Sequence, residues 1–131
     1  MLERWEVYMS KSALSVAVFA GYLLLLGLSL VLGPNVLLQA SRMAPTGEVW
    51  IRVVGMLVLL LAFYYWNAAR TELTSFFRWT VVARSSVPLF FLAFVAAGLA
   101  SPMLILFGVV DLAGALWTAL ALRRDARPTV T

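Results

Sequence analysis

The residue of this sequence best placed to do chemistry is Asp111, an acidic side chain inside an otherwise apolar run. Uncharged residues precede it from position 104 to 110 and follow it from 112 to 122. A carboxylate in such a run is costly if the surroundings are lipid. We therefore expect Asp111 to face other helices and either to pair with a cation or to stay protonated.

Small and polar residues recur around Asp111 with helical spacing. Gly108, Gly114 or Ala115, and Thr118 lie three or four residues apart and would form one narrow face with Asp111. Such a face lets a neighbouring helix approach closely. Two interpretations stay open: Asp111 locks two helices together by hydrogen bonds, or it forms a site for a ligand, an ion or a proton.

Two arginines are candidate partners for Asp111. Arg84 is the first choice, because a hairpin turn near Ser101 would bring it to within about 10 Å of the depth of Asp111. Arg52 begins another apolar run, and Glu48, four residues before it, offers Arg52 a nearer partner. The alternative for both arginines is that their side chains extend to the phosphates of the lipid headgroups.

Asn67 completes the candidate intramembrane polar site. It shares a helical stripe with Arg52 and Phe63, an arrangement that fits a small-molecule cavity as well as it fits an aromatic belt at the membrane interface. Pro88 follows Arg84 by four residues and removes a backbone donor, which predicts a kink in the helix. The kink would either open a cavity or only fit this helix to its neighbours.

Several classes of chemistry are excluded by composition. The 131 residues include no His and no Cys, which removes the usual ligands of zinc, copper, haem and iron–sulfur centres, together with disulfides and imidazole catalysis. The apolar runs hold no paired carboxylates, and no nucleophile with a base, glycine-rich phosphate loop or metal-ligand spacing occurs. We therefore expect no enzyme activity, no cofactor and no metal.

Four apolar runs must position these residues. Hydrophobic residues make up 63% of the chain and charged residues 12%, a composition unlike that of soluble domains. Uncharged runs of about 20 residues are typical of membrane-spanning helices. The sequence therefore predicts an all-α membrane protein, a single domain of residues 1–131 folded as a four-helix up-down bundle. The helices are expected at residues 13–32, 50–69, 80–99 and 103–122, with a hairpin turn at 98–102.

The first apolar run has one alternative interpretation, a cleaved signal peptide, which its length disfavours. The basic residues of the connections predict the orientation. Arg42 and Arg52 lie on one side of the expected bundle, whereas eight basic residues lie on the other, so both termini and the middle connection are expected to be cytoplasmic. The net charge of +4 then reflects orientation and attraction to anionic lipid, and no nucleic-acid partner is expected. The eight residues are Arg4, Lys11, Arg70, Arg78, Arg84, Arg123, Arg124 and Arg127.

Three segments carry a resemblance to a known group of proteins: residues 50–55 (WIRVVG), 68–70 (AAR) and 107–118 (FGVVDLAGALWT). With these segments and its length, the chain resembles the small bacterial four-helix membrane proteins that are DoxX-like or uncharacterised. The resemblance implies a four-helix bundle in the inner membrane and, in some members, association with quinone-linked redox complexes. This chain has no redox centre of its own, and no site residue is carried over.

Two functions fit these observations. The first is a scaffold or accessory subunit that binds a second copy or a partner membrane protein through small residues such as Ala93, Ala97, Gly108 and Ala115. The second is a small proton-coupled transporter or binder of a hydrophobic or cationic solute, with Asp111 as a switchable charge and aromatic cavity walls. The aromatic residues considered for the walls are Tyr22, Tyr64, Trp66 and Trp117.

Overall fold

The computed structural model describes residues 9–127, which form five helices and no strands. The helices are α1 (Lys11–Leu32), α2 (Pro34–Ala40), α3 (Trp50–Arg70), α4 (Thr74–Ala96) and α5 (Leu104–Asp125). Within this part of the chain, all except α2 are long and apolar enough to cross a membrane. The prediction of an all-helical fold with four long apolar helices is confirmed. Arg4, which contributes to the charge count, lies outside the described residues.

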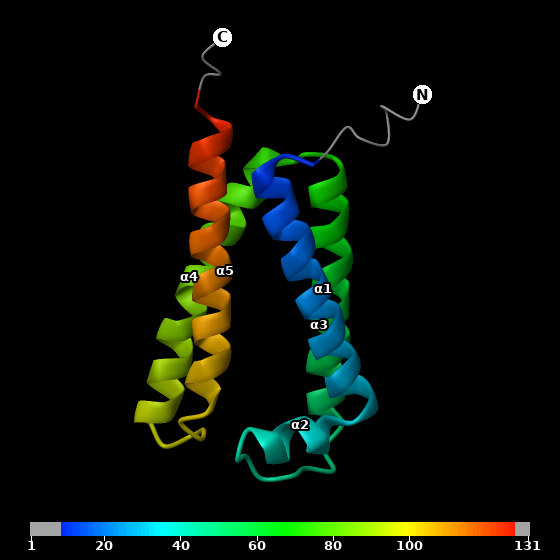
Figure 1. Cartoon of the computed structure of the whole chain (residues 1–131). Helices are drawn as coiled ribbons and strands as arrows, with labels where there is room; N and C mark the ends of the chain where they lie inside the picture. The colour runs from blue at the N-terminus through cyan, green and yellow to red at the C-terminus, as the bar shows by residue number, and fades with distance from the viewer. Residues whose placement is uncertain (1–8, 128–131) are drawn as a thin grey trace.

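The long helices form two antiparallel pairs. α1 packs along α3, α4 packs along α5, and the pairs meet mainly where α1 contacts α5. Figure 1 shows the pairs converging where α1 begins and α5 ends, and separating toward α2. We call the first of these ends, which also carries the α3–α4 connection, the closed end, and the other the open end. The bundle is therefore closed at one end only.

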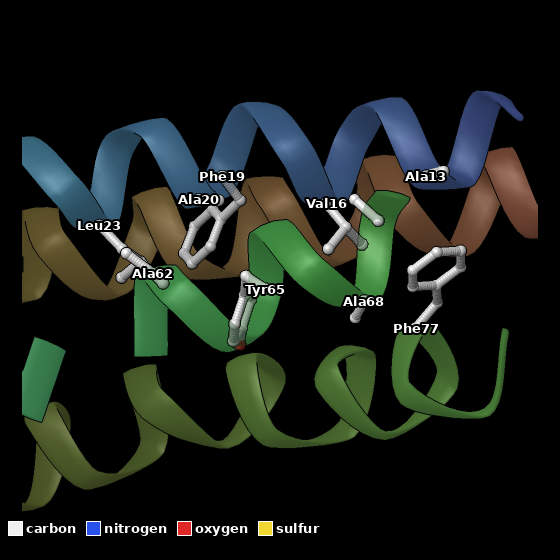
Figure 2. Close-up of a cluster of buried hydrophobic side chains, with 10 residues drawn as sticks. Ala13, Val16, Phe19, Ala20, Leu23, Ala62, Tyr65, Ala68 and Phe77 are labelled. Atoms are coloured by element: carbon white, nitrogen blue, oxygen red, sulfur yellow. The ribbon is translucent and has the colours of Figure 1, made fainter. Parts of the chain in front are cut away.

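The buried core lies toward the closed end. Figure 2 shows Phe19 of α1 pointing toward α3, which contributes Tyr65, and Phe77 of α4 lying beside Ala68. The centroids of the Phe19 and Tyr65 rings are 5.7 Å apart. Alanine at most of the other core positions of α1 and α3 lets the helices approach closely. These alanines are Ala13, Ala20, Ala62, Ala68 and Ala69.

Hydrogen bonds at the closed end tie three segments of the chain together through Ser10, Ser12, Glu72 and Asp125, which we call the polar clasp. The Oγ of Ser10 caps α1 by accepting from the Ala13 N–H at 3.1 Å, and its hydroxyl donates to Glu72 Oε2 at 2.7 Å. Ser12 donates to Asp125 Oδ2 from its N–H at 3.0 Å and from its hydroxyl at 2.5 Å. Carboxylates thus satisfy the free donors at the start of α1.

Residues in the left-handed backbone conformation follow the ends of two of the long helices. Gly98, with φ of 76°, follows α4, where glycine is the usual residue. Glu72, with φ of 53°, follows α3, although a side chain is disfavoured in this conformation. The Ser10 N–H donates to Glu72 Oε1 at 2.6 Å. The left-handed turn directs the Glu72 carboxylate toward the start of α1. The hydrogen bonds that Glu72 accepts there offset the strain of its backbone.

The helix boundaries differ most from those expected at the start of α4 and after α1. α4 begins at Thr74, six residues before the expected start at residue 80, and ends at Ala96. This earlier start places Arg84 roughly 15 Å inside the helix, so Arg84 is not a connection residue. Gly33 and Pro34 end α1 as expected, but Pro34 also begins the short helix α2, because proline is well suited to the first helical position.

Asp125 lies beyond the apolar run of α5, which ends at residue 122, and its carboxyl has a lowered pKa. Partial burial by itself would raise this pKa, but the hydrogen bonds from Ser12, Lys11 and Ser10 outweigh the burial. Because the folded-state pKa is lowered, the stabilisation by this carboxylate is present above the ordinary value of 3.8 and is lost as the pH falls through the folded-state pKa.

We therefore expect Asp125→Asn to lower the melting temperature in mild detergent at neutral pH. The difference between the variant and the wild-type protein should shrink as the pH is lowered below the ordinary carboxyl pKa, because the wild-type carboxylate then becomes protonated as well. Thermal unfolding followed by circular dichroism across the acid range measures both quantities. A difference that is independent of pH would show that the charge of Asp125 does not stabilise the clasp.

Candidate functional site

An apolar cavity of about 550 Å³ lies between the two helix pairs, on the side of the core that faces the open end. All five helices contribute side chains to its wall, and most of these are leucine, valine or phenylalanine. Among the described residues that line the cavity, Asp111 alone carries a charge. The volume falls within the range of about 300–1,000 Å³ that is typical of small-molecule sites.

Asp111 is the eighth residue of α5, and its half-buried side chain lines the cavity together with Phe107 and Leu104. Helical side chains lean toward the N-terminus of their own helix, which directs this carboxylate toward the open end. Arg84 and Tyr22 are two nearby groups on which the charge of Asp111 acts: the guanidinium directly, and the hydroxyl by opposing its ionisation. Neither interaction is a hydrogen bond within the described part of the chain, so the carboxylate is free on its cavity side.

Tyr22 of α1 lines the same cavity and places a second polar atom there. Its hydroxyl is buried and has no hydrogen-bond partner among residues 9–127. Its ring packs against Phe19, with the two ring centroids 5.2 Å apart. A buried hydroxyl without a partner costs about 1–3 kcal/mol, so a ligand that supplies a partner would recover part of this energy.

Arg84 is buried behind the cavity wall and is only 2% exposed. Its Nη2 donates to Thr118 Oγ1 at 2.8 Å and to Thr80 Oγ1 at 3.1 Å, and its Nε donates to the Thr80 carbonyl at 3.3 Å. The guanidinium carbon lies 4.6 Å from the centroid of the Phe19 ring. Nη1 is buried against Gly114 and has no hydrogen-bond partner within the described residues.

The structure thus replaces the expected Arg84–Asp111 pair with an Arg84–Thr118 pair. The register of the α4–α5 hairpin explains the difference. Arg84 and Thr118 each lie seventeen residues from Ser101 in the turn, whereas Asp111 lies only ten residues from it. Equal distances from the turn place two residues at the same depth. This signal was present in the sequence and could have identified Thr118 as the partner of Arg84.

Ser15 of α1 also belongs to the group of buried polar residues around Arg84 and Thr118, and the sequence did not predict this contact. Its Oγ lies 2.7 Å from Thr118 Oγ1, and its hydroxyl also donates to the Ser12 carbonyl at 2.7 Å. Ser15, Thr80, Arg84 and Thr118 therefore connect α1, α4 and α5, and we call them the Arg84 cluster. Nothing in the local sequence around Ser15 indicates which of the other helices it faces.

The other two predicted site residues lie away from the cavity's polar end. Arg52 lies in the first turn of α3, and its guanidinium donates to the Val31 carbonyl near the end of α1, a contact different from the expected one with Glu48. Asn67 donates to the Phe63 carbonyl of its own helix at 2.9 Å. Neither side chain lines the apolar cavity. Asp111 and Arg84 are therefore the two predicted site residues that the fold brings near each other.

The aromatic residues considered for the cavity walls are also separated. Tyr22 lines the main cavity, whereas Tyr64 lines a second one of about 270 Å³ beside Asn67. Trp66 and Trp117 are 46% and 43% exposed and line neither cavity. Most of the expected aromatic wall is instead supplied by phenylalanines of α4 and α5. They are Phe90, Phe91, Phe94 and Phe107.

Two of the small residues expected to contact a partner are covered by the chain itself. Gly108 is buried where α5 crosses Pro88, and a Cβ added to it would lie 3.0 Å from the Pro88 Cα. Ala115 is 1% exposed. Both residues therefore pack inside the fold and leave no surface for a partner, whereas Ala93 of α4 and Ala97, which follows α4, are exposed.

No protein-family model, curated protein or solved structure matches this chain. The resemblance to DoxX-like proteins therefore rests on the three sequence segments and the chain length.

Proposed function

We propose that this chain is an integral membrane protein that binds a hydrophobic solute between its two helix pairs and catalyses no reaction. The observation that carries the proposal is the apolar cavity of about 550 Å³ with one carboxylate on its wall. Sites for small molecules are usually concave and apolar, with a few polar groups that orient the ligand. The cavity of this chain has both properties.

The surface of the long helices supports a membrane location. Large apolar side chains on their outer faces are widely exposed, as at Leu25 (69%), Val82 (73%) and Leu89 (67%). In lipid these faces need no protein partner, whereas in water they would form an aggregation-prone surface. Without Arg84, six basic residues of the described part of the chain still lie toward the closed end and two toward the open end. We therefore propose that the closed end is cytoplasmic, in a bacterial inner membrane.

An accessory role in a larger membrane assembly is the second candidate. Ala93 of α4 and Ala97, the residue that follows α4, support it, because they are exposed four residues apart and would allow a helix of a second copy or a partner protein to approach. Gly108 and Ala115 do not support this candidate, because other helices of the same chain cover them. The solute-binding proposal is therefore the better supported of the two.

Filling the cavity should abolish solute binding. Leu26 lines the cavity, so the larger ring of Leu26→Trp would occupy space that a solute needs. Leu25→Trp is the matched control, because Leu25 is 69% exposed on the outer face of the same helix. The probe is a long-chain alcohol that carries a photoactivatable diazirine, added to protein reconstituted in phosphatidylcholine vesicles. Peptide mass spectrometry then locates the labelled residues after irradiation.

In the wild-type protein and in Leu25→Trp, label is expected on cavity residues such as Val58 and Phe91 in addition to the lipid-facing residues. In Leu26→Trp, the cavity label should fall to background while the label on lipid-facing residues is unchanged. Label confined to lipid-facing residues in all three proteins would overturn the proposal.

A further inference from the structure

We infer that the solute carries a protonated amine, that Asp111 and Tyr22 bind its ammonium group, and that its apolar part fills the cavity. This inference rests on the proposed solute-binding function and adds the chemical class of the ligand. It concerns the part of the cavity wall to which α1 and α5 each contribute one polar side chain. Ser41, which follows α2, is the third polar residue that lines the cavity, and the other lining residues are apolar.

The cavity wall carries one charge that a ligand could match. Asp111 is the single charged residue among the described lining residues, and no side chain there donates a hydrogen bond to it. In its ionised form, a half-buried carboxylate needs a cation or hydrogen-bond donors to compensate for the water it has lost. A ligand with an ammonium group supplies both the charge and the donors. A hydrocarbon supplies neither, and an anion would add repulsion.

Arg84 does not fill this role from inside the protein. Its Nη2 and Nε are held by Thr80 and Thr118, and its guanidinium stacks on the Phe19 ring. Arg84 is 2% exposed, does not line the cavity, and points its remaining nitrogen at Gly114. The Arg84 charge reaches Asp111 through space only. The side of the carboxylate that faces the cavity is therefore available to a ligand.

The Tyr22 hydroxyl is a second polar group at the cavity. It is a buried atom of α1, it lines the same cavity as Asp111 of α5, and it lacks a hydrogen-bond partner within residues 9–127. An ammonium group has three donors and no acceptor, so it can donate to the carboxylate and to the hydroxyl oxygen at the same time. The phenylalanine faces of the wall, including Phe91 and Phe107, are favourable surroundings for a cation.

The test compares three diazirine probes with the same alkyl chain, which end in an ammonium, a hydroxyl or a carboxylate group. Wild-type protein in phosphatidylcholine vesicles should give roughly tenfold more cavity label with the amine than with the alcohol, because charge-assisted hydrogen bonds are the stronger ones. Asp111→Asn should remove this preference and keep the label from the alcohol, which shows that the cavity is intact. Tyr22→Phe should reduce the preference in part.

Asp125→Asn is the matched control, because it makes the same chemical change in the polar clasp, away from the cavity. It should keep the wild-type preference for the amine. Equal cavity label from the amine and the alcohol in the wild-type protein would overturn the inference and leave the proposed function standing. A preference that survives undiminished in Asp111→Asn would overturn it as well. Absence of cavity label with every probe would instead overturn the proposed function.

Discussion

Thr118→Val is expected to lower the free energy of unfolding by about 3 kcal/mol, although valine has nearly the same shape as threonine. Thr118 is fully buried and accepts from Arg84 Nη2 at 2.8 Å, and its hydroxyl lies 2.7 Å from Ser15 Oγ. Arg84 already has one nitrogen without a partner within the described part of the chain. Loss of Thr118 Oγ1 would therefore leave a buried charge with a single side-chain acceptor, Thr80.

The measurement is unfolding of the purified protein in mild detergent, followed by circular dichroism. Thr71→Val is the matched control, because Thr71 is exposed and its hydroxyl bonds only to its own helix. Arg84→Met in the Thr118→Val background should restore most of the stability, since it removes the buried charge whose acceptor has been lost. If Thr118→Val were as stable as Thr71→Val, the Arg84 cluster would have no stabilising role.

The second large effect is expected for Gly55→Val, at a close approach of α1 and α3. A Cβ on Gly55 would lie 2.8 Å from the Leu30 Cβ and 2.9 Å from the backbone nitrogen of Val31. Backbone atoms cannot move aside as flexible side chains do, so α1 and α3 must separate. Overpacking of this kind costs about 1–3 kcal/mol, and we expect the upper part of this range because α1–α3 is the most extensive helix contact.

Gly21→Val is the control for this prediction. Gly21 lies within α1, and nothing lies within 4 Å of a Cβ added there. The same substitution should therefore leave the melting temperature in mild detergent nearly unchanged at position 21 and lower it clearly at position 55. Equal melting temperatures for the two variants would show that α1 and α3 do not need the small residue at Gly55.

The contacts within each helix pair and the hydrogen bonds between the pairs together explain where the fold leaves a cavity. The close α1–α3 contact at Gly55 holds one helix pair together, and the close contact of Gly108 with Pro88 holds the other. The Arg84 cluster and the polar clasp then join the pairs toward the closed end. Toward the open end the two pairs move apart (Figure 1), and the cavity is lined by residues of both pairs. The same sequence features therefore determine both the packing and the place of the proposed site.

Much of the helical framework could be predicted from the sequence. Uncharged runs of sufficient length identify the four long helices, since a charge is costly in lipid and a helix satisfies all of its own backbone groups. The run from residue 98 to 102 marks the α4–α5 hairpin, where Gly98 takes a positive φ. The three- and four-residue spacing of small and polar residues predicts one narrow face of α5, and Gly108, Ala115 and Thr118 on this face are buried.

The neighbours of each polar side chain were decided by the tertiary structure. The sequence indicates the depth of a residue and the face of the helix on which it lies, but it does not indicate which helix lies beside that face. Ser15 and Thr118 are 103 positions apart, and Ser12 and Asp125 are 113 apart, so only the lateral arrangement of α1 and α5 brings each pair into contact. The tertiary structure also determines that the Asp111 carboxylate has no partner within the described residues. The register of the α4–α5 hairpin places Arg84 beside Thr118 and leaves Asp111 on the cavity wall.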